Sequence, residues 1–116
     1  MPPSRIKTVN LEEGMPTVQE ALFRVERELH LAREHGPKFI KFIHGYGSTG
    51  SGGEIRMAVQ KQLQDAKDHG EIREFIFGEN WAKSDDATWK LLGAHPGLKQ
   101  DRDLGKNNRG ITIVVL

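Results

Sequence analysis

The sequence has no cysteine, and its 116 residues carry a formal net charge of only +1. The missing cysteine excludes disulfides and thiolate metal sites, and it fits a reducing compartment. Because the charges are balanced, the chain is no polycation, and any nucleic-acid binding has to come from a local patch. There is also no apolar run of membrane-spanning length and no signal-peptide core at the N-terminus. We therefore expect a cytoplasmic protein, a monomer or weak oligomer, without a membrane partner.

Apolar patterning predicts a single small domain over residues 1–116. Alternating or continuous apolar runs indicate four strands, at residues 6–11, 39–43, 72–77 and 110–116. Helical spacing indicates two helices, at about 17–35 and 53–69, each stopped by a glycine. Strand–helix–strand crossovers imply a largely parallel sheet with right-handed connections. The predicted fold is α/β, an α+β two-layer sandwich in the order βαβαββ, with two helices on a mixed four-stranded sheet.

Capping signals refine two parts of this prediction. Thr17 and Glu20 have the spacing of a capping box at the start of the first helix. The excursion 78–109, before the last strand, is too long to be structureless in a compact domain. Within it, Ser84-Asp85-Asp86 is expected to cap a short helix that stops before Pro96. Residues 101–109 mix acidic and basic side chains around two asparagines, which indicates a solvated turn.

The segment 39–56, FIKFIHGYGSTGSGGEIR, is the most informative stretch for function. A strand runs through His44 into a glycine-rich turn and leaves as a helix. This arrangement predicts an anion site, because free backbone N–H groups and the positive end of the helix point at one spot. No Lys-Ser or Lys-Thr follows the glycines, so a Walker loop is excluded, and no acidic residue completes a dinucleotide fingerprint. The candidate phosphate-binding residues are Gly45, Tyr46, Gly47, Gly52, Gly53 and Arg56.

Several features together resemble the Smr (small MutS-related) domain family. That family's core motif is a strand ending in His-Gly-x-Gly, followed by a helix that opens with a Leu-Arg-like pair. Its last strand reads Gly-x-Thr-x-Val-x-Leu. The matching segments here are His44–Gly47, Ile55-Arg56 and Gly110–Leu116, in the same order of elements. The resemblance implies the family's fold, binding of DNA or RNA, and an endonuclease activity.

One departure from the family pattern concerns the chemistry. The family's first strand usually ends in Leu-Asp-Leu-His-Gly, and its Asp and His are thought to serve the nuclease activity. Here Asn10 and Glu12 stand in those two places. An amide does not titrate, whereas a glutamate can act as a base or hold a divalent cation with Glu13. The resemblance thus implies the fold more strongly than cleavage, and the candidate catalytic residues are His44 and Glu12, with no metal site assigned.

Each candidate residue also has a purely structural explanation. His44 would transfer protons in phosphodiester cleavage, or would only bond a backbone carbonyl. Arg56 would contact a phosphate, or would be a surface charge. Tyr46 would stack on an unpaired base, or would simply lie exposed in a loop. Three functions follow: an endonuclease with weak nicking activity, a non-catalytic binding module for structured DNA or RNA, or a domain for phosphorylated ligands or protein partners. The altered first strand favours the second.

Overall fold

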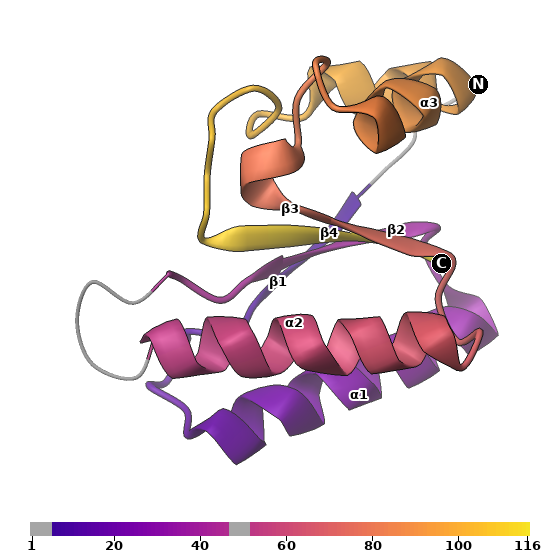
Figure 1. Ribbon diagram of the computed structural model, residues 1–116. Helices are drawn as coiled ribbons and strands as arrows, with labels where there is room; N and C mark the ends of the chain where they lie inside the picture. The colour runs from indigo at the N-terminus through magenta and orange to yellow at the C-terminus, as the bar shows by residue number, and fades with distance from the viewer. Residues whose placement is uncertain (1–5, 47–51) are drawn as a thin grey trace.

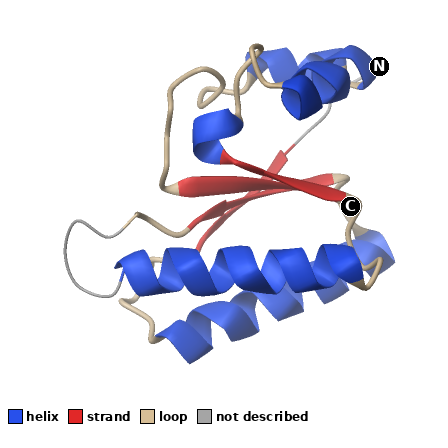
Figure 2. Ribbon diagram, viewed as in Figure 1, coloured by secondary structure: helices blue, strands red, loops and turns tan. Residues whose placement is uncertain are grey.

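The computed structural model describes residues 6–46 and 52–116, in which four strands and three α-helices are connected by short turns and two 3₁₀ helices. Figures 1 and 2 show one central sheet with helices on both sides. In chain order the elements are β1 (Ile6–Asn10), α1 (Val18–His35), β2 (Phe39–Ile43), α2 (Gly52–Asp68), β3 (Glu74–Phe77), η1 (Gly78–Asn80), α3 (Asp86–Ala94), η2 (Pro96–Gln100) and β4 (Ile111–Val115). None of the helices in this part of the chain is long and apolar enough to cross a bilayer.

The sheet is mixed, as predicted, with the strand order β1-β2-β4-β3. Only β1 and β2 pair in parallel, whereas β4 runs antiparallel to both β2 and β3. The expectation of a largely parallel sheet was therefore wrong. The last strand inserts between β2 and β3 and runs antiparallel to both, so these two strands are not neighbours in the sheet. All five residues of β4 are buried, which fits its apolar sequence and its interior position.

The two faces of the sheet are covered by different parts of the chain. In Figure 1, α1 and α2 lie across one face, and α3 with the short helices lies across the other. The first face buries a core that includes Val25, Ile40, Phe42, Val59 and Leu63. The second buries Phe39, Trp81, Leu92, Leu98 and Ile113. The predicted two-layer sandwich thus has a third layer, because the excursion after β3 packs its own apolar side chains against the sheet.

Local sequence signals account for most helix boundaries. The capping box is present, with the Thr17 hydroxyl accepting from the Glu20 N–H and the Glu20 carboxylate accepting from the Thr17 N–H, both at 3.1 Å. The short helix of the excursion is α3, capped by Asp85 as expected. The glycine stop is seen at Gly70, whose φ is +76°, but not at Gly36, whose φ of −102° is not left-handed. Gly36 instead lies against Ala32, where a side chain would have no room.

Candidate functional site

His44 follows the carboxyl end of β2, as predicted, but its side chain is completely buried. The ring Nδ1 lies 2.6 Å from the carbonyl oxygen of Gly45, and Nε2 lies 2.9 Å from the Thr112 hydroxyl. A carbonyl only accepts, so Nδ1 carries the proton, and a neutral ring then accepts from the Thr112 hydroxyl at Nε2. Burial lowers the pKa of His44, and the nearby Arg56 charge lowers it too. The lowered pKa favours the neutral imidazole, and both of its nitrogens are engaged in hydrogen bonds within the protein.

Glu12 lies directly over the backbone of Gly45. A methyl group added to Gly45 would come within 2.6 Å of the Glu12 carboxylate, and Gly45 has a φ of +72°. Both observations explain why glycine occupies this position. The side chain of Asn10 accepts from the Glu12 N–H at 2.9 Å and so shapes the turn that brings Glu12 here. Glu12 thus lies beside the glycine turn, although no hydrogen bond joins it to His44 in the described part of the chain.

Arg56 is in the first turns of α2 and is paired with an acidic residue. Its Nη2 donates to Glu79 at 2.9 Å, and both side chains are one-quarter exposed. Arg56 Nε and the other Glu79 oxygen are buried and have no partner within the described residues. Sequence reasoning treated Arg56 as a free cation, because Glu79 is 23 residues away and nothing in the local pattern joins the two. Any phosphate contact by Arg56 has to compete with this ion pair.

The glycine-rich turn itself is described only at its two ends. Gly47 lies outside the described residues, so its predicted role stays a prediction. Gly52 and Gly53 form the start of α2, as expected for a turn that feeds a helix. No group of three or more acidic or histidine side chains in residues 6–46 and 52–116 has the arrangement of a metal site. Glu12 and Glu13 thus remain candidates for a divalent cation on sequence grounds alone.

A pocket that the sequence did not reveal opens beside Tyr46. Its volume is about 550 Å³, and it is lined by Tyr46, Lys106, Asn107, Asn108 and Arg109; we call it the Tyr46 pocket. Tyr46 follows β2, and the other four residues belong to the turn before β4. For that turn the sequence predicts only a solvent-exposed connection. Lys106, Asn107 and Arg109 are exposed, and neither cation has an ion pair within the described residues. The pocket therefore combines two free positive charges with an exposed aromatic ring.

Hydrogen bonds fix the two walls of this pocket relative to each other. The carbonyl oxygen of Gly110 accepts from the backbone N–H groups of His44 at 2.9 Å and Gly45 at 3.1 Å. The side chain of Asn108 accepts from the Gly110 N–H and donates to Asp103. These bonds join the turn before β4 to the segment that carries Tyr46. The pocket is thus organised before any ligand arrives.

A buried ion network supports the same turn from beneath. Lys41, in the middle of β2, is 5% exposed and donates to Asp101 at 2.8 Å and to Asp103 at 2.6 Å. Asp101 also accepts from the indole N–H of Trp81. Burial alone would raise the pKa of Asp103, but hydrogen bonds from Lys41 and Asn108 outweigh it and hold that pKa below its usual value. Lys41 therefore connects the sheet to the wall of the Tyr46 pocket.

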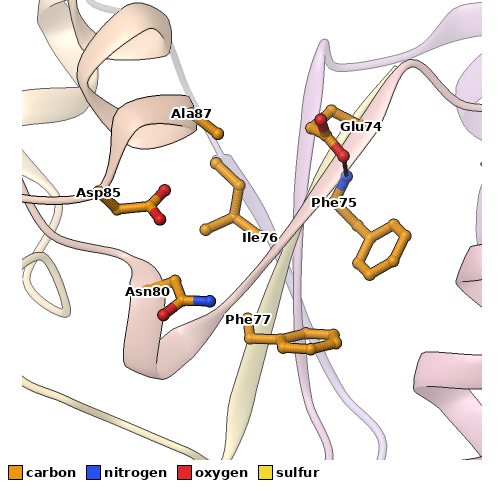
Figure 3. Close-up of a pocket in the computed structure, with 7 residues that line it drawn as sticks. All are labelled: Glu74, Phe75, Ile76, Phe77, Asn80, Asp85 and Ala87. Carbon is orange, nitrogen blue, oxygen red and sulfur yellow. Dashed lines mark hydrogen bonds between the residues drawn. The ribbon is translucent and has the colours of Figure 1, made fainter.

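A second hollow lies at the free edge of β3 (Figure 3). It is about 190 Å³ in volume and is lined by Glu74, Phe75, Ile76, Phe77, Asn80, Asp85 and Ala87. Figure 3 shows that Asp85 and Asn80 lie on one side of β3 and the two phenylalanines on the other. Its two ionisable side chains are both acidic, which opposes phosphate binding. Of the two hollows, only the Tyr46 pocket suits an anion.

A solved structure shares this architecture. The crystal structure of the Smr domain of Thermus thermophilus MutS2 matches 95% of this chain and 96% of its own chain, with a TM-score of 0.58 and 24% sequence identity. This chain has the Smr-domain fold. The likeness confirms the fold that the motifs predicted, over nearly the whole chain. No protein-family model and no curated protein matches the sequence. At this identity the Smr fold is established, and the activity has to be argued from the residues of the site.

Proposed function

We propose that this Smr-fold protein is a single nucleic-acid-binding domain over residues 1–116. It binds the phosphates of DNA or RNA at the Tyr46 pocket and does not cleave the nucleic acid efficiently. The observation that carries the proposal is the pairing of two free cations, Lys106 and Arg109, with an exposed aromatic ring in one pocket. Cations that are not neutralised by neighbouring acids are available to phosphates, which dominate the affinity for nucleic acids. A net charge near zero makes such a local patch necessary.

The geometry around His44 supports binding rather than catalysis. A general base needs a free lone pair within reach of the proton that it removes. The Nε2 lone pair of His44 is taken by the Thr112 hydroxyl, and the ring has no exposed surface. Asn10 does not titrate and bonds the backbone of its own turn. Glu12 and its neighbour Glu13 are exposed carboxylates here, but the buried His44 offers neither of them a partner for proton transfer, so the site lacks the pair of proton-transfer groups that efficient cleavage requires.

Other predicted contacts are secondary in this proposal. Gly45 has little free backbone toward a ligand, because its N–H already donates to Gly110 and its carbonyl accepts from His44. Arg56, with Gly52 and Gly53 at the start of α2, supplies a second phosphate contact only when the Glu79 carboxylate gives way. We therefore assign the main electrostatic contribution to the turn before β4. The sequence alone favours the glycine-rich turn after β2 instead.

The salt dependence of binding tests this proposal directly. Anisotropy of a labelled oligonucleotide is measured at several salt concentrations for wild type, for Lys106→Ala/Arg109→Ala and for Lys90→Ala/Lys99→Ala. The second double variant removes the same charge from α3 and η2, away from the pocket. The slope of log affinity against log salt should fall by about 1.4 to 1.8 in the pocket variant, because each of the two lost phosphate contacts removes about 0.7–0.9. The control variant should keep the wild-type slope.

Several results would contradict the proposal. Salt-independent binding would show that phosphate contacts do not dominate the affinity, and equal slopes in both double variants would show that the phosphates bind outside the Tyr46 pocket. Release of the oligonucleotide by millimolar inorganic phosphate alone would favour a small phosphorylated ligand.

Cleavage is followed on supercoiled DNA and on RNA, with and without a divalent cation, for wild type, His44→Ala and Glu12→Gln. We expect at most weak nicking that needs both residues. Robust nicking that survives Glu12→Gln would show that the altered first strand is no barrier to catalysis.

A further inference from the structure

We infer that the Tyr46 pocket receives an unpaired nucleotide, so that the ligand of this domain is single-stranded or locally unpaired nucleic acid. In this arrangement the Tyr46 ring stacks on the base, the Asn107 amide bonds the edge of the base, and Lys106 and Arg109 hold adjacent phosphates. The inference rests on the proposed function and specifies its substrate class. DNA and RNA share the chemistry that is used here, and the experiment separates them.

The first argument is the state of Tyr46. It is the only tyrosine of the chain, and 59% of its surface is exposed although His44, two residues earlier, is buried. Its hydroxyl has no hydrogen-bond partner within the described residues, so neither packing nor a polar contact occupies the ring. A base has an apolar face of its own, and stacking on an aromatic side chain stabilises single-strand complexes by about 1–3 kcal/mol per base.

The second argument is a contrast between two neighbouring asparagines. Both polar atoms of the Asn108 side chain are used, one by the Gly110 N–H and one by Asp103. Asn107 is exposed, has a left-handed φ of +53°, and makes no side-chain hydrogen bond within the described residues. A side-chain amide offers a donor and an acceptor together, which matches the paired donors and acceptors on the edge of an unpaired base. Asn107 is thus free for a ligand, whereas Asn108 holds the turn.

The third argument is size and access. A pocket of about 550 Å³ is within the usual range for small-molecule sites, and cations and amides rather than apolar groups line most of it. In a duplex both faces of a base are covered by its neighbours, so a paired base cannot stack on Tyr46. Flipping a paired base out of the duplex costs a few kcal/mol of unstacking and unpairing free energy, and a base in a loop or single strand largely avoids this cost. The fixed walls of the pocket keep the ordering cost of the protein low.

The experiment measures affinity for three labelled oligonucleotides: single-stranded DNA, single-stranded RNA and a blunt DNA duplex of the same length. The protein variants are wild type, Tyr46→Ala, Tyr46→Phe, Asn107→Gly and the control Trp89→Ala, which removes another exposed aromatic side chain, on α3. Glycine is chosen at position 107 because it keeps the positive φ while removing the amide. A single-stranded oligonucleotide with one 2-aminopurine reports stacking on an aromatic ring as a change in fluorescence.

We expect Tyr46→Ala to weaken single-strand binding by about 5- to 150-fold and duplex binding by less than about twofold. Tyr46→Phe and Trp89→Ala should bind like wild type, and Asn107→Gly should reduce the preference between bases. The 2-aminopurine change should vanish only in Tyr46→Ala. Equal losses for single strands and duplex in Tyr46→Ala, or none, would overturn this inference while leaving the phosphate-based proposal intact. No binding to any oligonucleotide would overturn both. Unequal affinities for DNA and RNA would show which sugar the pocket prefers.

Discussion

Replacing Lys41 by methionine should destabilise this domain far more than replacing an exposed lysine. Lys41 is 5% exposed, and its ammonium group lies 2.8 and 2.6 Å from two carboxylates that are themselves 12% and 18% exposed. Its loss removes two charge-assisted hydrogen bonds of about 1.5–3 kcal/mol each and leaves two neighbouring carboxylates without their cation. Removing one partner of a buried ion pair costs about 3–5 kcal/mol, and we expect a loss in that range.

The size of this loss makes it easy to measure. The free energy of unfolding is about 5–15 kcal/mol for a typical domain, so the variant loses a large share of it. At roughly 4 °C per kcal/mol for a chain of this size, Tm should fall by about 12–20 °C in a thermal scan followed by circular dichroism. The matched control is Lys61→Met, whose ammonium lies 3.8 Å from Asp65 on the surface of α2 and is 80% exposed. That variant should change stability by less than about 0.5 kcal/mol.

The pH dependence gives an independent check on the cause. In wild type the folded pKa of Asp103 is below its ordinary value of 3.8, so its contribution to stability is present above that pH and is lost as pH falls through the lower folded value. Without Lys41, the main influence that opposes burial is lost, so the pKa of Asp103 should be higher than in wild type, and the destabilisation by the unpaired carboxylate is relieved as it takes up a proton. The stability gap between Lys41→Met and wild type should therefore be largest at pH 7 and should narrow toward pH 4. A gap that is constant with pH, or a variant as stable as Lys61→Met, would refute this reasoning.

Two further predictions concern other contacts. Glu79→Gln should release Arg56 for phosphate, so the salt slope of oligonucleotide binding should steepen by up to about 0.9, and Arg56→Ala in the same chain should abolish the change; an unchanged slope in Glu79→Gln would show that Arg56 does not reach the ligand. Thr17→Ala removes the hydroxyl half of the capping box and should cost about 1 kcal/mol in urea unfolding, whereas Thr17→Asp should keep most of the stability; a loss equally large in Thr17→Asp would contradict the capping explanation.

The parts of the fold that the sequence predicted are those set by neighbouring residues. The capping box at Thr17, the cap of α3 at Asp85 and the buried character of β4 all follow from a few adjacent side chains. The position of β4 between β2 and β3 depends on contacts between segments about 70 and 35 residues apart in sequence, which apolar periodicity does not encode. The third layer was missed for a related reason, because a short helix could be recognised locally but not the face that it covers.

In the candidate site, too, the features set by neighbouring residues were predicted and those set by distant residues were not. Tyr46 was recognised from its motif, whereas the position of Glu12 against Gly45 depends on the pairing of β1 with β2, which no local pattern encodes. The ion pair of Arg56 with Glu79 and the Tyr46 pocket were not predicted, because each joins segments that are far apart in the sequence. A usable signal was nonetheless present: the sequence FIKFI has a lysine inside a buried strand, and a buried cation requires a carboxylate partner elsewhere in the chain. The candidates Asp101 and Asp103 stand a few residues before Lys106 and Arg109.

The burial of His44 changes how the glycine motif is understood in this chain. A histidine followed by glycines suggests a reactive group at a phosphate site, yet here the ring joins two strands, from the Gly45 carbonyl to the Thr112 hydroxyl of β4. The same segment donates two backbone hydrogen bonds to Gly110, one residue from Arg109. In the proposed function His44 would contribute to binding indirectly, because it fixes the segment after β2 against β4 and so helps to set the distance between Tyr46 and the turn before β4.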